Sequence, residues 1–256
     1  MTSVAVVIPL YNDALRIGRA IQSALIQQYS AEVIVIDDCS TDDSVRVVRE
    51  LAEQDHRIRI FSLAQNSGPA VARNFGVEKA DSEFIAFLDS DDEYLPDYFS
   101  DVIPLMLEDS TLHACKVGME FWDPLKGWIL PAYDARYLAV VFSSSCNILM
   151  RRHAFLLMGG FSTDPLFREA NGGEDVAFCQ AIAQHLAPLR KIDKVFYRCW
   201  SQAGSHVDKF LQETRLAAVK DGFEFVQLTE QQKPGGGLEQ AIAAYMKRVA
   251  ERLASG

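Results

Sequence analysis

The 256-residue sequence lacks the cysteine pattern of a disulfide framework or of a structural zinc site. Its five cysteines are odd in number, scattered along the chain and without Cys-x-x-Cys spacing. Paired or clustered cysteines mark secreted disulfide-rich domains and zinc modules, so neither class is indicated. We therefore expect reduced cysteines, as in a cytoplasmic protein, at Cys39, Cys115, Cys146, Cys179 and Cys199.

Long apolar runs are also absent from the sequence. No stretch approaches the roughly 18 consecutive apolar residues that a transmembrane helix needs. The N-terminus passes directly into the apolar run Val4–Ile8 without a basic lead or a cleavage region. We interpret that run as a first strand and not as a signal peptide. A cytoplasmic location is expected, and the sequence leaves open both a peripheral contact with the inner face of the membrane and a homodimer.

Positive charge is in deficit, because 25 lysines and arginines face 35 acidic residues, for a net charge of −10. A general nucleic-acid binder presents a basic face, so nucleic acid is not an expected partner. An anionic ligand would need local help from arginines, from helix N-termini or from a metal ion. The glycine fingerprint of dinucleotide oxidoreductases is missing as well.

The first half of the chain alternates β-branched runs with segments of helical periodicity. This βαβαβαβ order predicts an α/β fold with a mostly parallel sheet and helices on both of its faces. In such open sheets, ligands bind beyond the carboxyl ends of the strands. The predicted strands are 4–9, 32–37, 57–63 and 83–88, and the predicted helices are 13–28, 43–54 and 69–79.

The second half of the chain has a looser pattern. We expect residues 1–205 to form one domain of two parts, at about 1–95 and at about 96–205. Residues 206–256 are expected to form a C-terminal helical extension. Its two helices are predicted at 208–232 and 238–253, on either side of a Pro-Gly-Gly-Gly breaker. The other predictions are helices at 97–108 and 174–185 and strands at 114–122, 127–130, 146–150 and 194–200.

The fourth predicted strand ends in the acidic segment Asp89-Ser90-Asp91-Asp92. Carboxylates one residue apart after a buried strand can converge on a hard divalent cation such as Mg²⁺ or Mn²⁺. A cation held by only one or two carboxylates keeps positions for substrate phosphates and neutralises a diphosphate leaving group. The structural alternative is a capped helix start, since aspartate is common at N-caps and turns.

Polar residues also follow the second and third strands. Asp38 could accept hydrogen bonds from a nucleotide base or ribose, although the neighbouring acidic residues could instead serve a turn and a helix cap. Arg73 lies on the helix after a Gly-Pro turn. Its planar guanidinium could meet a base or phosphates, or it could form an ordinary ion pair.

Four segments, PLYN at 9–12, IDDCSTD at 36–42, NSGPAVARNFG at 66–76 and FLDSDD at 87–92, together resemble a known family. In order and spacing they are similar to the donor-binding half of glycosyltransferase family 2, whose members have the GT-A fold. The resemblance continues through 146–152, 159–161 and 173–175, and so covers roughly residues 3 to 180. It implies that residues 1–205 are a glycosyltransferase domain with a donor half at about 1–95 and an acceptor half at about 96–205. One departure is Cys39, which stands where the family's DDGSTD stretch usually has glycine.

The resemblance implies roles for individual residues. Asp38 would contact the base, usually uracil, and Arg73 would lie near the base or the diphosphate. Asp89 would reach the ribose or the metal, and Asp91 would ligate the metal. The implied nucleotide-binding set is Pro9, Tyr11, Asn12, Asp38, Arg73, Asp89 and Ser90.

The segment Gly172–Asp175 precedes a predicted helix. An acidic helix start can simply complement the helix dipole. The alternative is a general base that takes the proton of an attacking sugar hydroxyl. The resemblance assigns that role to Asp175, with Glu174 as the neighbouring candidate. One-step attack with a separate base implies inversion at the anomeric carbon.

Further residues are candidates on the acceptor side or at the metal. Asn147 could line an acceptor pocket, and Trp122 could stack on a sugar ring, as could Trp128, Tyr133 or Trp200. Such aromatics are more often core residues. His206 could be a third metal ligand or a solvated loop histidine.

The sequence thus predicts an inverting, Mn²⁺- or Mg²⁺-assisted glycosyltransferase. Its expected donor is a nucleotide-diphosphate sugar, UDP-linked by preference, and its acceptor a glycan or a lipid-linked sugar. A sugar nucleotidyltransferase is disfavoured, because no glycine-rich phosphate loop follows the first strand. A catalytically inactive nucleotide-sugar-binding partner subunit is the other alternative, disfavoured because Asp91 and Asp175 are both present.

Overall fold

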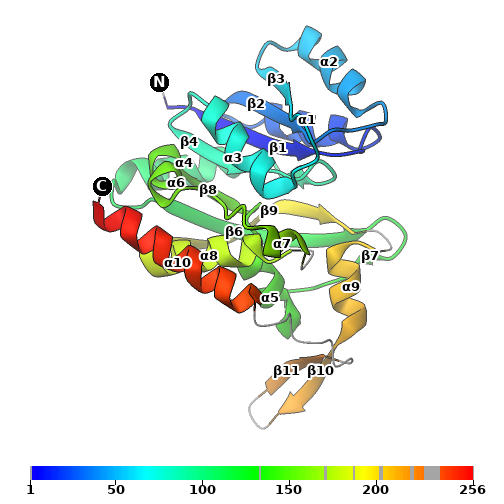
Figure 1. Cartoon of the computed structure of the whole chain (residues 1–256). Helices are drawn as coiled ribbons and strands as arrows, with labels where there is room; N and C mark the ends of the chain where they lie inside the picture. Colours follow the sequence, from blue (N-terminus) through cyan, green and yellow to red (C-terminus); the bar gives the residue numbers. More distant parts are fainter. Residues whose placement is uncertain are drawn as a thin grey trace.

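The structure, a computed structural model, describes residues 2–132, 134–169, 172–186, 188–201, 204–219, 222–227 and 237–255. A single mixed sheet runs through most of the molecule, and helices cover both of its faces (Figure 1). The α/β class and the mixed sheet flanked by helices are therefore confirmed.

The first half of the chain forms the parallel part of the sheet. Strand β1 pairs in parallel with β2 on one side and with β4 on the other, and β2 pairs with β3. The spatial order β3-β2-β1-β4 brings four strand ends to one edge. The elements are β1 (Val4–Leu10), α1 (Ile17–Leu25), β2 (Ser30–Asp37), α2 (Ser44–Gln54), β3 (Ile58–Ser62), α3 (Pro69–Lys79) and β4 (Phe84–Phe87).

The second half extends the same sheet past β4 in the order β8-β6-β9-β5. Strand β8 is antiparallel to both β4 and β6, whereas β6 and β9 run parallel. The strands are β5 (Glu93–Tyr94), β6 (Ala114–Asp123), β7 (Gly127–Trp128), β8 (Ile148–Arg151) and β9 (Leu189–Trp200). The helices are α4 (Tyr98–Glu108), α5 (Ala135–Ser143), α6 (Arg152–Met158), α7 (Pro165–Glu169) and α8 (Glu174–His185).

Alternation along β1 divides the core into two layers. Val4, Val6 and Ile8 face one side of the sheet, where they join apolar residues of α1, α2 and α4. Ala5 and Val7 face the other side, where α3, α6 and α8 pack. Because successive side chains of a strand point to opposite faces, a fully buried strand has to be apolar throughout. This explains the continuous apolar run at the N-terminus.

The helix predicted over 208–232 is wrong. Helix α9 (His206–Glu213) is short, and it is followed by the antiparallel strands β10 (Thr214–Val219) and β11 (Gly222–Gln227). The hairpin projects at the lower end of Figure 1. The two strands pair from Thr214 with Gln227 to Val219 with Gly222, and this pairing outweighed the helical spacing of the sequence. Residues 228–232 lie outside the described part of the chain.

Smaller differences concern element bounds. Helix α1 begins at Ile17 and not at Asp13, because the Asp13 carbonyl accepts the Arg16 and Ile17 amides in a turn. Strand β9 begins at Leu189, earlier than predicted. Helix α5 was not predicted, and Asp134 caps it by accepting the Arg136 amide.

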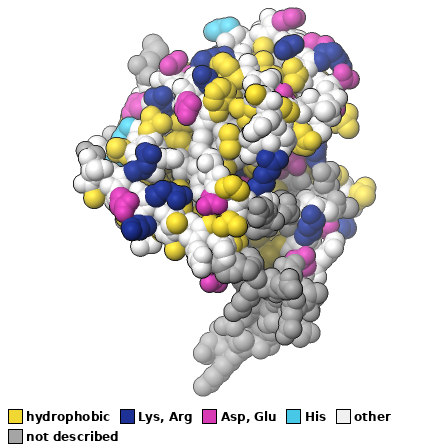
Figure 2. Space-filling model, viewed as in Figure 1, with side chains coloured by type: hydrophobic (Ala, Val, Ile, Leu, Met, Phe, Trp, Pro, Cys, Tyr) yellow, Lys and Arg dark blue, Asp and Glu magenta, His cyan; other side chains and the backbone are white. Residues whose placement is uncertain are grey.

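The last helix, α10 (Gly237–Ser255), packs against α6, α7 and α8. Its buried residues Ala241, Tyr245 and Val249 belong to the same core layer as α3. Within the described ranges, no helix combines the length and the apolar character needed to cross a membrane. Figure 2 shows basic and acidic side chains interspersed over one face of the molecule.

Candidate active site

A cleft of about 580 Å³ opens at the carboxyl ends of β1, β2 and β4, and we call it the strand-end cleft. It brings together residues far apart in sequence, as the topology predicts. This cleft is lined by nine of the residues that the sequence predicted for the site. They are Pro9, Tyr11, Asp38, Arg73, Asp89, Ser90, Asp91, Glu174 and Asp175. Asn66 and Arg168 are among the other lining residues.

Asn12 supports the cleft from behind and is not among its lining residues. Its φ is 51°, a left-handed conformation that asparagine tolerates. Its Oδ1 accepts the Thr41 amide at 2.7 Å, and its own amide donates to Ser40 Oγ at 3.0 Å. Asn12 thus ties the end of β1 to the turn after β2.

Asp38 is buried, and it anchors the loop between β3 and α3. Its Oδ1 accepts the Ser67 amide at 2.6 Å, and its Oδ2 accepts the Gly68 amide at 2.8 Å. Asn66 Nδ2 also donates to the Asp38 carbonyl at 3.0 Å. Both carboxylate oxygens therefore hold the loop that forms one wall of the cleft.

Cys39 has a φ of 65°, in the left-handed region. Its thiol lies 3.2 Å from the Leu63 carbonyl oxygen. A residue with a Cβ is strained in this conformation, and glycine is not. The turn geometry therefore explains why a glycine is expected at this position in a DDGSTD stretch.

Arg73 connects the two halves of the cleft. Only 3% of its side chain is exposed, and its guanidinium contacts Asp89 Oδ1 at 2.7 Å and Asp175 Oδ1 at 3.1 Å. These carboxylates come from the end of β4 and the start of α8. A planar guanidinium can satisfy two carboxylates in a fixed geometry, so Arg73 fixes the position of each relative to the other.

The other oxygen of Asp89 is also engaged, because Oδ2 accepts the Cys146 thiol at 3.0 Å. Burial, and then the neighbouring Asp89, raise the pKa of Cys146 well above its usual range. The thiol therefore stays protonated and donates. This leaves Asp89 more constrained than Asp91.

Asp91 lies near other carboxylates, and few basic groups are close enough to offset their negative charge. Burial and the nearby Asp89 raise the pKa of Asp91 to about 6, while Arg16 Nη1 is 3.5 Å from its Oδ2. The backbone carbonyl of Asp91 accepts the Arg19 guanidinium. Excess negative charge at a strand end is the condition that a divalent cation relieves.

Asp92 fixes the segment after β4 by hydrogen bonds to β9. It is buried, and it accepts Tyr197 Oη at 2.7 Å and the Trp200 amide at 2.8 Å. Burial and then Asp91 and Asp89 raise the pKa of Asp92 well above its usual range. Asp92 thus links the acidic segment to β9 and does not enter the cleft.

The donor set fits a cation that takes most of its ligands from substrate and water. Among the described residues, no three His, Cys, Asp or Glu side chains converge as a metal site would require. Mg²⁺ is typically held by one or two carboxylates plus phosphate oxygens. Asp91, and Asp89 after it, are the residues placed to contribute. His206 begins α9, and its side chain lies outside the described part of the structure.

Asp175 stands in the first turn of α8, after Gly172 and Gly173, whose φ values of 135° and 105° favour glycine. Ser145 Oγ donates to Asp175 Oδ1 at 2.6 Å, and Arg73 contacts the same oxygen. Asp175 Oδ2 has no hydrogen bond from the described residues. One third of the side chain, 33%, is exposed to the cleft side.

Arg168 was not singled out from the sequence. It extends from α7, and its guanidinium donates to the Asn66 carbonyl at 2.7 Å and to Asn66 Oδ1 at 2.5 Å. This bridge closes one side of the strand-end cleft. No sequence pattern marked Arg168, because its partner lies 102 positions away.

Two predicted acceptor-side residues lie away from the cleft. Asn147 is fully buried, and its Nδ2 donates to the Val117 carbonyl at 2.6 Å, so it supports β6 from inside. Trp122 packs edge-on against Trp200, with 6.5 Å between the ring centroids, and the Arg198 guanidinium lies over the Trp122 ring. Trp128 is 59% exposed, and Tyr133 lies outside the described residues.

Comparison with known proteins bears on the whole arrangement. The family model described as "Glycosyl transferase family 2" matches residues 5–158. An uncharacterized glycosyltransferase of Haemophilus influenzae is 38% identical over 109 residues, which are 42% of this chain and 44% of that protein. The putative teichuronic acid biosynthesis glycosyltransferase TuaG of Bacillus subtilis is 39% identical over 108 residues, 42% of this chain and 43% of that protein. The chain thus spans less than half the length of these curated relatives.

Among solved structures, residues 1–349 of S. aureus TarS in complex with UDP have a similar fold. The TM-score is 0.65 at 22% identity, over 78% of this chain and 61% of that one. At this identity the likeness concerns the fold alone.

Proposed function

The chain belongs to glycosyl transferase family 2 and has the GT-A fold, and from this premise we propose that it is an inverting glycosyltransferase. The proposed reaction moves a sugar from a nucleotide-diphosphate donor to a hydroxyl of an acceptor. The observation that carries the proposal is the bridge by Arg73, which holds a donor-side carboxylate and a candidate base in one cleft.

The proposed donor is a UDP-sugar, bound at the strand ends. Pro9, Tyr11, Asp38 and Ser90 line the cleft where a nucleotide would lie. TarS, whose fold is similar, has been crystallised with UDP. TuaG is named for a polysaccharide pathway, which supports a glycan or lipid-linked acceptor as the second substrate.

Asp175 is the proposed general base, with Glu174 beside it in the cleft wall. Its Oδ2 would accept the proton of the acceptor hydroxyl as that oxygen attacks the anomeric carbon. The new carbon–oxygen bond forms while the bond to the diphosphate oxygen breaks, and the nucleotide diphosphate leaves. Because attack and departure occur on opposite sides, an α-linked donor gives a β-linked product. Arg73 and Ser145 would fix the base through Oδ1.

Mn²⁺ or Mg²⁺ is the proposed cofactor, which Asp91 would hold with Asp89 as a second carboxylate. When bound, such an ion neutralises charge on a diphosphate leaving group. The support is the acidic strand end with its few basic partners. The division into a domain at 1–205 and an extension at 206–256, a homodimer, peripheral membrane contact and the absence of nucleic-acid binding stay predictions.

The test is Asp175→Asn, assayed against a panel of UDP- and GDP-sugars with nucleotide release as the readout. Asparagine keeps the shape but cannot accept the proton, so transfer should fall about 10²- to 10⁴-fold while UDP affinity stays unchanged. Asp193→Asn, at an aspartate that is 91% exposed, is the matched control and should behave as wild type. Unchanged turnover in Asp175→Asn would assign the base to another residue.

A further inference from the structure

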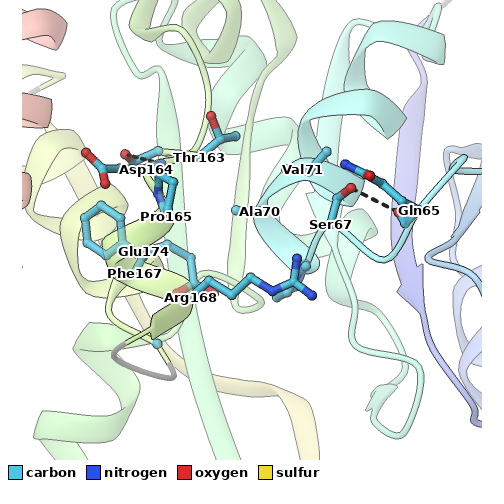
Figure 3. A pocket seen from close by; sticks show the side chains of 14 residues that line it. Gln65, Ser67, Ala70, Val71, Thr163, Asp164, Pro165, Phe167, Arg168 and Glu174 are labelled. Carbon is cyan, nitrogen blue, oxygen red and sulfur yellow. Dashed lines mark hydrogen bonds between the residues drawn. The ribbon is translucent and has the colours of Figure 1, made fainter.

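A second cavity, of about 540 Å³, lies between the start of α3 and the segment around α7, and we call it the α3–α7 cavity. Its two walls face each other in Figure 3, where Gln65, Ser67 and Val71 stand opposite Thr163, Asp164 and Pro165. Its volume is that of a small-molecule site.

The α3–α7 cavity adjoins the strand-end cleft. Gly68, Pro69, Arg168 and Glu174 line both. The Arg168 side chain reaches across toward the α3 side, where it binds Asn66, so it forms a partition between the two spaces (Figure 3). A molecule in the cavity would therefore lie beside Glu174, one residue from the proposed base.

The lining combines small apolar surfaces with neutral polar groups. Ala70, Val71 and Pro165 supply apolar area, whereas Gln65 and Thr163 are exposed and can exchange hydrogen bonds with a ligand. A sugar ring has the same character, because it presents C–H surfaces together with hydroxyls that both donate and accept. Ligand sites of this size commonly pair apolar walls with a few polar groups.

The charges of the cavity disfavour an anionic occupant. Asp164 and Glu174 are the acidic members of the lining, and Arg168 is the basic one. The Arg168 guanidinium is already committed to two oxygens of Asn66. A phosphate or carboxylate would thus meet two like charges, whereas the hydroxyls of a neutral sugar can donate to the same carboxylates.

We propose that the α3–α7 cavity is the acceptor subsite and that it takes a neutral sugar residue of the acceptor glycan. This inference rests on the proposed transfer function. It places the acceptor on the α7 side of Arg168, with its reactive hydroxyl directed past Glu174 toward Asp175. The donor occupies the strand-end cleft on the other side of the partition.

The experiment uses the whole chain, in the presence of UDP, titrated by ligand-observed NMR with four probes. These are the methyl β-glycosides of glucose, galactose, N-acetylglucosamine and glucuronic acid. Thr163→Trp and Gln65→Trp fill the cavity from opposite walls at exposed positions, where folding should be preserved. Gln54→Trp, at an exposed position of α2, is the matched control.

At least one neutral glycoside should bind wild type and the control, and more tightly than the glucuronide. Each cavity variant should weaken that binding at least about tenfold, with UDP affinity by calorimetry changed less than about twofold. Binding of no neutral glycoside, preference for the glucuronide, or unchanged binding in both cavity variants would overturn the inference. Failure of wild type to bind UDP would instead count against the proposed donor function, because glycoside binding is scored separately.

Discussion

Arg73 is almost fully buried, so its charge has lost most of its hydration. Two carboxylates offset that loss, one from β4 and one from α8. Removing one partner of a buried ion pair lowers stability more than replacing both partners with apolar residues, because it leaves one buried charge unpaired. Arg73 therefore acts as a positioning residue for both Asp89 and Asp175.

Replacement of Arg73 by lysine should keep the positive charge and remove the planar guanidinium that contacts both carboxylates. A single ammonium cannot span both carboxylates in the same geometry, so Asp175 should shift, and kcat should fall about 10²-fold. Steady-state kinetics of nucleotide release would measure this. Arg46→Lys, at an exposed arginine paired with Asp43 and Glu50, should leave kcat unchanged. Equal kcat in both variants would refute the positioning role.

Asp91→Ala addresses the cation. Removal of the least constrained carboxylate at the strand end should abolish any enhancement of UDP affinity by Mn²⁺, while metal-free UDP binding persists. Calorimetry of UDP binding with and without Mn²⁺ gives both values. Asp101→Ala, at a surface aspartate paired with Lys194, is the control and should keep the wild-type response. A Mn²⁺ response that survives in Asp91→Ala would exclude Asp91 as a ligand.

At the scale of elements, the close approach of α3 to β1 positions Arg73. Gly76 permits this approach, because a Cβ built there would lie 2.3 Å from Val7 Cγ1. Helix α3 thus lies flat on the parallel strands, and Arg73, one turn earlier on the helix, reaches the cleft. The conformational freedom of Gly76 is not the reason for its presence; the lack of a side chain is.

Gly76→Ala should therefore lower the free energy of unfolding by about 1–3 kcal/mol, because the packed core has no room for the methyl group. Gly18→Ala is the matched control in α1, where a Cβ would meet nothing within 4 Å. It should raise the free energy of unfolding by about 0.5–1 kcal/mol through loss of chain entropy in the unfolded state. Urea denaturation would measure both, and equal effects would contradict the steric explanation.

The hairpin β10–β11 shows where element prediction failed. Local spacing suggested a helix over 208–232, yet the chain turns back after Val219. A short amphipathic run can partly fit both the 3.6-residue period of a helix and the two-residue period of a strand. Pairing with a neighbouring strand then decides which of the two structures forms. The predicted bounds of α2, α3 and α8 agree with the structure to within one residue, because local signals mark their starts: Pro69 begins α3, and Glu174 follows two glycines at the start of α8.

At the scale of the whole molecule, α10 closes the core layer that also contains α3, α6 and α8. Tyr245 is buried there, and its hydroxyl donates to the Gly160 carbonyl at 2.7 Å. Gly160 is followed by Phe161, whose amide donates to Asn74 Oδ1 at 2.8 Å on α3. The last helix is thereby connected to the helix that carries Arg73.

Tyr245→Ala should destabilise the whole domain by about 3–5 kcal/mol, as for other large aromatic truncations in a core. We expect a single unfolding transition at lower denaturant, followed by both fluorescence and circular dichroism. Lys247→Ala, at a side chain that is 79% exposed on the same helix, should change stability by less than about 0.5 kcal/mol. Separate transitions for the two probes would show that α10 unfolds independently of the sheet.

The sequence by itself determined the α/β class, the positions of the first four strands along the chain and the set of strand-end residues. These follow from local signals. A buried strand must be apolar, and ligands of such sheets bind at the carboxyl ends of the strands, where polar residues are therefore expected. It also placed Asp175 at a helix start. The roles proposed for these residues stay predictions.

Only the tertiary structure decided which of these groups touch. Asp38 holds the β3–α3 loop, Asn147 is enclosed beneath the site, and Arg73 bridges carboxylates 16 positions and 102 positions away. The Arg168 partition and the α3–α7 cavity likewise arise between segments distant in sequence. Contacts of this kind leave no periodic trace along a chain, because they depend on how packed elements bring unrelated positions together.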